Sequence, residues 1–155
     1  MLCQATGQRC DGFLTHNWGS DGEGRRTHER VGAASAALKA RGLSTWFDEE
    51  RLEGNILEQM TDGIDESRLV VVFVTKNYML KVAGRGEKGR DDNCRAEFEY
   101  ACNRKGVDRM LSVVTDPAAL DARRWRGAVG MKLGTRLYVD LSDDDDASFD
   151  RSLAK

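Results

Sequence analysis

Five short apolar segments alternate with amphipathic stretches along this 155-residue chain, and that alternation constrains the fold more than any other feature. Strands separated by segments long enough for a crossover helix pair in parallel, so the pattern predicts an α/β fold with a parallel sheet. The third segment, "LVVVFVT", is apolar almost throughout, as expected for a central strand covered on both faces. The predicted strands are residues 12–15, 43–47, 69–75, 110–114 and 137–141.

Helical periodicity fills the stretches between the strands. Residues 29–41 and 55–67 each carry apolar side chains three or four residues apart, which predicts two helices with one buried face. Asp116 followed by Pro117 is typical of the start of a short helix. The length of the chain predicts one domain, residues 11–155, after a lead-in segment of residues 1–10.

Charge and hydropathy argue against several classes of function. The 24 basic and 26 acidic residues give a formal net charge of -2 and are spread along the chain, so we expect no nucleic-acid partner. The longest apolar run, residues 69–74, is far shorter than the roughly 20 residues that cross a bilayer, and no signal peptide is evident. We therefore expect a cytoplasmic protein with no membrane partner.

No pattern of potential ligands predicts a metal site. The four cysteines show no C-x-x-C, the two histidines show no H-E-x-x-H, and we interpret Cys94 and Cys102 as small core residues in a reducing compartment. Cys94 and Cys102, eight residues apart, would be separated by about 12 Å along a helix, too far for a disulfide. Four aspartates at residues 143–146 could gather calcium, but after Ser142 they are more typical of a helix start.

The segment "GRGEKGRDDNCRAEFEYA", residues 84–101, contains the glycine spacing of dinucleotide-binding loops. That fingerprint works when its first glycine directly follows a strand and its last opens a helix. Gly84, Gly86 and Gly89 begin about nine residues after the third predicted strand, in a stretch rich in charge. A surface loop is therefore our interpretation of these glycines.

Glu97, in the same segment, is a candidate for chemistry. Asp92 or Asn93 would cap a helix with Glu97 at the edge of its buried stripe. A helix that follows a strand in a parallel sheet starts at the carboxyl edge, where ligands bind. Glu97 is therefore either a site carboxylate or a solvated acid that the helix dipole favours. The expected buried stripe comprises Cys94, Phe98, Ala101 and Cys102.

Several motifs, taken together, resemble a TIR domain, the Toll/interleukin-1 receptor and resistance-protein module, from about residue 11 to residue 141. "DGFLTH" resembles the first box of the family, and "NCRAEF" is similar to its W-C-x-x-E-L motif. "GLSTWFDEERLEGNILEQMTDGIDESRLVVVFVTKNY" is similar to its second strand, BB loop, following helix and central strand. The resemblance implies a flavodoxin-like, five-stranded parallel sheet in the order 2-1-3-4-5, with helices on both faces.

The resemblance also implies one of two functions. Some TIR domains are NAD+ glycohydrolases or cyclases that give nicotinamide and ADP-ribose or a cyclic ADP-ribose, and Glu97 falls on their catalytic position. Others are non-catalytic scaffolds that act by homotypic TIR–TIR association. We favour the enzyme, with NAD+ as substrate, no cofactor, and cleavage that depends on assembly in immune or cell-death signalling. Nicotinamide leaves as a neutral base, so one carboxylate that stabilises an oxocarbenium-like transition state is sufficient.

The resemblance assigns further residues to the substrate and to association. The expected substrate-binding residues are His16, Asn17, Trp18, Trp46 and Asn93. Asn93 stands where catalytic members usually carry tryptophan, and Trp46 could equally be a core residue at the end of its strand. The BB loop, expected to take part in association, comprises Asp48, Glu49, Glu50, Arg51, Leu52, Glu53 and Gly54.

Overall fold

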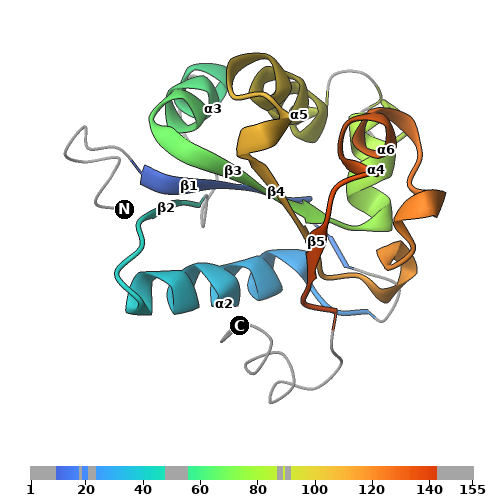
Figure 1. The fold of residues 1–155 in the computed structure, drawn as a ribbon, viewed down its shortest axis with the longest axis horizontal. Helices are drawn as coiled ribbons and strands as arrows, with labels where there is room; N and C mark the ends of the chain where they lie inside the picture. Colours follow the sequence, from blue (N-terminus) through green and yellow to red (C-terminus); the bar gives the residue numbers. More distant parts are fainter. Residues whose placement is uncertain are drawn as a thin grey trace.

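Five strands, each parallel to its neighbours, form one sheet in the order β2-β1-β3-β4-β5 (Figure 1). The computed structural model describes residues 10–17, 19–20, 24–47, 56–86, 89 and 92–142. The predicted α/β class and the strand order are confirmed. The strands are β1 (Cys10–Thr15), β2 (Thr45–Trp46), β3 (Ser67–Val74), β4 (Met110–Val114) and β5 (Tyr138–Asp140).

Helices cover both faces of the sheet, as expected. Helix α2 (Thr27–Ala40) lies on one face, and the other four helices lie on the opposite face (Figure 1). Those four are α3 (Ile56–Asp65), α4 (Lys76–Val82), α5 (Asn93–Arg104) and α6 (Gly127–Leu133). Three short 3-10 helices complete the described elements: η2 (Val107–Arg109), η3 (Pro117–Ala119) and η4 (Ala122–Arg124).

Side-chain caps fix several of the helix starts. The Asp92 side chain accepts a hydrogen bond from the backbone N–H of Cys94, and Asp116 accepts one from Ala118, as the sequence predicted for α5 and η3. The Thr75 hydroxyl oxygen accepts from the N–H of Tyr78 and so caps α4, a helix that the sequence did not predict. Thr75 therefore begins a helix instead of ending a strand.

The core is divided between the two faces of the sheet. On the side of α2, Leu14, Val71 and Phe73 pack with Val31 and Ala34 of that helix. On the opposite side, the Trp46 ring stacks on Phe13 with 4.7 Å between ring centroids. This parallel stack joins β2 to β1 at the edge of the sheet, where only two residues of β2 form the strand.

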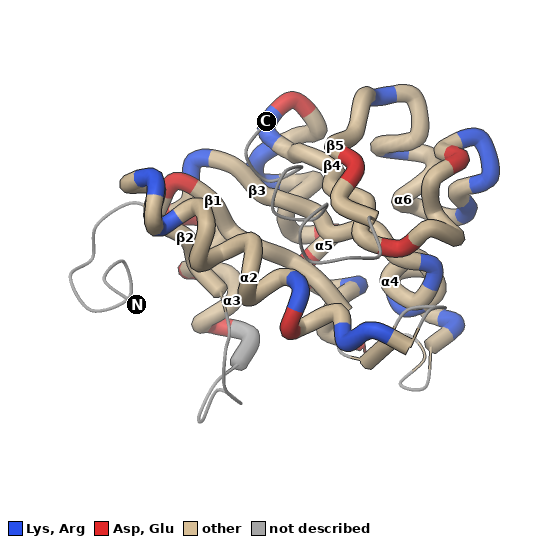
Figure 2. The backbone as a smooth tube through the Cα atoms, turned by 90° about the horizontal axis from the view of Figure 1, so that it is seen from below, with Lys and Arg blue, Asp and Glu red and all other residues tan. Residues whose placement is uncertain are grey.

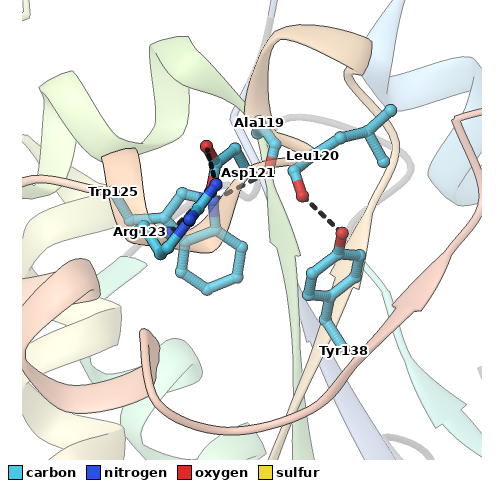
Figure 3. A network of polar contacts seen from close by, with 6 residues as sticks. All are labelled: Ala119, Leu120, Asp121, Arg123, Trp125 and Tyr138. Carbon is cyan, nitrogen blue, oxygen red and sulfur yellow. Dashed lines mark hydrogen bonds and ion pairs between the residues drawn. The ribbon is translucent and has the colours of Figure 1, made fainter.

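The connection between β4 and β5 is held by its own side chains. Trp125 Nε1 donates to the carbonyl of Ala119 at 2.8 Å, and the Tyr138 hydroxyl donates to the carbonyl of Leu120 (Figure 3). Arg123 pairs with Asp121 on the exposed side of the same turn. These contacts tie η3 and η4 to β5, far along the chain from the segment 84–101.

Among the described residues, Cys94 and Cys102 are free, whereas Cys10 is disulfide-bonded. Cys94 is buried in the core and Cys102 packs against it, as expected for both, but the disulfide at Cys10 does not agree with the expected reducing compartment. No described group of three or more His, Cys, Asp or Glu side chains could hold a metal ion, and no described helix is long and apolar enough to span a membrane. Figure 2 shows lysines and arginines interspersed with acidic residues along the described chain. The helix expected after Ser142 lies outside the described residues.

Two glycines that face aromatic rings from helices make a matched test of this packing. A Cβ at Gly63 in α3 would lie 2.8 Å from the Trp46 ring, whereas a Cβ at Gly32 in α2 would lie 3.6 Å from Phe47. We expect Gly63→Ala to lower the free energy of unfolding by about 1–3 kcal/mol through overpacking. Gly32→Ala should be neutral or stabilising by up to about 1 kcal/mol through helix propensity. Urea unfolding compares the two, and equal effects would contradict the packing described.

Candidate functional site

Polar side chains gather where β1 and β3 end. Thr15 is the last residue of β1, and Thr75 directly follows β3, its neighbour in the sheet. The Thr75 hydroxyl donates to Asn17 Oδ1 at 2.6 Å, and both side chains are buried. Because the carboxyl ends of parallel strands meet at one edge of the sheet, this cluster lies where ligands bind in folds of this type.

Glu97 reaches this cluster from helix α5. The Thr15 hydroxyl donates to Glu97 Oε2 at 2.7 Å, and the Glu97 side chain is half-buried. The carboxylate is thus directed at the end of β1. Glu97 is therefore not a freely solvated acid at the start of its helix.

Cys94 fixes the same helix to the same strand end. Its Sγ donates to the backbone carbonyl of His16 at 3.4 Å, one residue beyond Thr15. Cys94 and Glu97 are three residues apart and therefore share a helix face, so one face of α5 contacts two consecutive residues of the β1 end. Burial, reinforced by the nearby Glu97 charge, raises the pKa of the Cys94 thiol well above its usual range. Cys94 is therefore an uncharged anchor and not a nucleophile.

Tyr78, in helix α4, contacts the same strand end from the core. Its hydroxyl lies 3.1 Å from Thr15 Oγ1, and the side chain is 0% exposed. Burial is the main cause that raises the pKa of Tyr78 well above its usual value, so the phenol is protonated at neutral pH. Sequence reasoning did not single out Tyr78. The available signal was Thr75 three residues before it, a spacing typical of a helix N-cap.

His16 forms a second pair beside the cluster. Its Nε2 lies 2.8 Å from Nδ1 of His28 in α2, and both rings lie against Phe47. Burial is the largest cause and the nearby His28 the second cause that together lower the pKa of His16 to about 3. His16 is therefore neutral near pH 7. His28 was not among the predicted site residues, because its approach to His16 depends on how α2 packs.

Known proteins can be compared with this geometry. A sequence model for a family described as TIR domain matches residues 13–153. The chain belongs to the TIR domain family. Among solved structures, the TIR domains of the activated Roq1 resistosome directly recognising the pathogen effector XopQ align with a TM-score of 0.60 and 19% identity. The alignment covers 94% of this chain and 95% of that one, which shows a shared fold. No curated protein matches the sequence significantly.

The predicted substrate-binding residues of this TIR domain have different placements. His16 and Asn17 lie in the polar cluster, and Asn17 is 0% exposed. Asn93 is exposed as the first residue of α5, four residues before Glu97 and therefore on the same side of the helix. Trp18 lies outside the described residues, as does the whole predicted BB loop, residues 48–54.

Trp46 is a core residue in this TIR domain. It is 6% exposed, with Phe13 stacked on its ring and Gly63 in close contact. Its ring therefore lies between β1 and α3, a placement that does not agree with stacking on a substrate ring. The sequence left both roles open because an aromatic residue at a strand end is compatible with either.

The described glycines of this spacing, Gly84, Gly86 and Gly89, do not directly follow a strand. Helix α4 separates these glycines from the end of β3. Gly84 has a φ of 75°, and its N–H donates to the carbonyl of Lys81, so it ends that helix. The interpretation as a loop agrees with this placement.

Buried His16 gives a prediction about pH. Its pKa is about 3 in the folded protein and 6.5 ordinarily, so its contribution to stability is complete above pH 6.5 and is lost as pH falls towards 3. Each pH unit in that window lowers the free energy of unfolding by up to about 1.4 kcal/mol. Urea unfolding at pH 7 and pH 5 measures the loss. His16→Phe should reduce this dependence, and an unchanged dependence would contradict the burial of a neutral imidazole.

Proposed function

We propose that this TIR domain cleaves the nicotinamide–ribose bond of NAD+, to give nicotinamide and ADP-ribose or a cyclic ADP-ribose, with Glu97 as the catalytic carboxylate. The observation that carries the proposal is the hydrogen bond from Thr15 to Glu97 Oε2, which directs an acid on α5 to the carboxyl edge of the sheet. The similarity of "NCRAEF" to the family's W-C-x-x-E-L motif, which puts Glu97 at the glutamate of that motif, also supports the proposal.

The reaction needs charge more than proton transfer. Nicotinamide is cationic while it is attached to the ribose and leaves as a neutral base, so its departure needs no general acid. Positive charge develops on the ribose as the bond breaks, and a carboxylate fixed next to that ring stabilises it. Holding the sugar in place supplies the remaining part of the catalysis. Water that adds to the ribose carbon and releases a proton gives ADP-ribose, and an atom of the same molecule that adds instead gives the cyclic product.

The neighbours of Glu97 suit this role. The pKa shifts of Cys94 and Tyr78 are upward and that of His16 is downward, so all three groups are uncharged near pH 7. Glu97 itself is half-buried. A carboxylate that is partly shielded from water acts on a developing cation with less screening than it would in water.

The proposals on association and on the signalling role rest on analogy with a similar solved structure. The similar solved structure is that of an activated resistosome that recognises a pathogen effector. We propose that this domain likewise acts in immune or cell-death signalling in the cytoplasm, and that homotypic TIR–TIR association turns on cleavage. The predicted surface for association is the BB loop, residues 48–54.

A non-catalytic signalling scaffold is the second candidate. It is favoured by Asn93, which is exposed at the start of α5 where catalytic members usually carry tryptophan. Without that aromatic ring, the domain could retain the fold and the Thr15–Glu97 contact and still lack one wall of a substrate site. The two candidates differ in whether nicotinamide is released.

Glu97 and Glu99 provide a matched pair of variants on one helix. Glu99 is exposed and pairs with Arg95 at 3.0 Å, a surface contact of small energetic value. With the purified domain at high concentration and NAD+, we expect Glu97→Gln to reduce nicotinamide release by at least about 100-fold. Glu99→Gln should retain wild-type release, measured by liquid chromatography.

Other results would favour the scaffold. A wild-type domain that associates but releases no nicotinamide would contradict the enzyme. Equal activity in wild type and Glu97→Gln would show that another group carries the reaction. A rate per molecule that rises with protein concentration would support activation by association.

A further inference from the structure

A line of hydroxyl groups connects the core with Glu97. The Tyr78 hydroxyl lies 3.1 Å from Thr15 Oγ1, and the Thr15 hydroxyl donates to Glu97 Oε2 at 2.7 Å. The three residues come from α4, the end of β1 and α5, which are far apart in the sequence. Glu97 is thus connected through one intermediate to a fully buried phenol.

The direction of the hydrogen bonds follows from the carboxylate. An ionised carboxylate only accepts, so the single proton of the Thr15 hydroxyl is given to Glu97. In the contact between the two hydroxyl groups, the Tyr78 hydroxyl is therefore the donor and Thr15 Oγ1 the acceptor. Because burial raises the pKa of Tyr78, that phenol keeps the proton it donates. Hydrogen bonds in such a chain polarise one another, most strongly at the charged end.

Tyr78 is itself held in place from two sides. Its backbone N–H donates to Thr75 Oγ1 at 2.9 Å in the N-cap of α4. Its ring meets Phe98, the residue after Glu97, edge to face with 6.4 Å between centroids. Tyr78 therefore contacts both the residue that binds the Glu97 carboxylate and the neighbour of Glu97 on α5. A shift of Tyr78 would be transmitted to Glu97 by both routes.

We propose that Thr15 and Tyr78 are positioning residues for Glu97, which hold its carboxylate in one orientation at the carboxyl edge of the sheet. This inference rests on the proposed NAD+ cleavage. It assigns a functional reason to two buried hydroxyl groups that touch no substrate themselves. A small displacement of a catalytic group from the reacting atoms lowers the rate of the chemical step more than it weakens substrate binding.

Three conservative variants test the two hydroxyl groups. Tyr78→Phe removes one hydroxyl and keeps the ring, and Thr15→Val removes the other and keeps the shape. We expect each to lower kcat for nicotinamide release about 10-fold, the effect of one hydrogen bond, with KM changed less than about twofold. Thr15→Ser keeps a hydroxyl on the same carbon and should retain most of the wild-type kcat. A purely structural role would not produce this rescue together with the split between kcat and KM.

A matched control removes a buried hydroxyl on the other side of the sheet. Ser35 Oγ in α2 lies 2.7 Å from Thr45 Oγ1, and both side chains are buried. Ser35→Ala should lower stability but leave kcat unchanged. A loss of kcat in Ser35→Ala equal to that in Tyr78→Phe would overturn the inference, because any loss of stability would then have the same effect.

A second measurement does not depend on activity. The urea unfolding midpoints of Tyr78→Phe, Glu97→Gln and the double variant form a cycle. If the hydroxyl chain couples the two residues, the double variant shifts the midpoint by less than the sum of the single shifts. Additive shifts would overturn the inference.

The outcomes separate this inference from the proposed function. If Glu97→Gln abolishes nicotinamide release while Tyr78→Phe keeps the wild-type kcat, positioning is wrong and the enzyme stands. If the wild-type domain releases no nicotinamide under associating conditions, the proposed function fails and the positioning role fails with it. Coupled midpoints together with the kcat loss in Tyr78→Phe support both.

Discussion

The parallel pairing of β1 with β3 is the constraint on which the rest of this structure depends. In that register Thr15 lies opposite Val72, so β1 ends while β3 continues to Val74. The end of β1 therefore lies beside β3, which extends further toward the same edge of the sheet. There Asn17, after β1, bonds to Thr75 at the start of α4. Helix α5 contacts Thr15 through Glu97 and His16 through Cys94. A shift of one residue in this register would turn these side chains to the other face.

The polar cluster at this edge is held together because its members satisfy one another's hydrogen-bonding groups. Thr15, Asn17, Thr75 and Tyr78 are all almost completely buried, and each takes part in a hydrogen bond with another member or with Glu97. A buried hydroxyl or amide without a partner costs about 1–3 kcal/mol, so removing one member leaves another unsatisfied. The cluster therefore couples the placement of Glu97 to the stability of the sheet. Few single changes at this edge would be purely local.

Much of the fold could be predicted because periodicity reports burial directly. The five strands, α2, α3 and α5 each carry a regular apolar pattern or a recognisable cap. Helix α4 was missed because it starts immediately after the apolar run of β3, so nothing in composition separates the two. Helix α6 was missed because it is seven residues long and contains two glycines, Gly127 and Gly130.

The candidate site was less accessible to the sequence. Glu97 could be found because its position in a helix and the family motif agree. Tyr78 and His28 become neighbours of the site only through the packing of α4 and α2, which no local pattern encodes. The burial of Trp46 under Phe13 and Gly63 likewise depends on how β2 meets α3. Residues that reach the site only through tertiary contacts can be identified from the three-dimensional structure but not from a local sequence pattern.

The protonation states around Glu97 limit the chemistry that this edge can perform. With a pKa of about 3, His16 is neutral at pH 7 and carries no extra proton to donate. The raised pKa values of Cys94 and Tyr78 make these two groups poor proton donors. A reaction whose leaving group must be protonated would find no suitable acid among these three groups. Release of neutral nicotinamide needs no such acid. A directed carboxylate beside these three uncharged groups therefore suits the proposed reaction, in which the leaving group departs as a neutral molecule, better than ordinary glycoside hydrolysis.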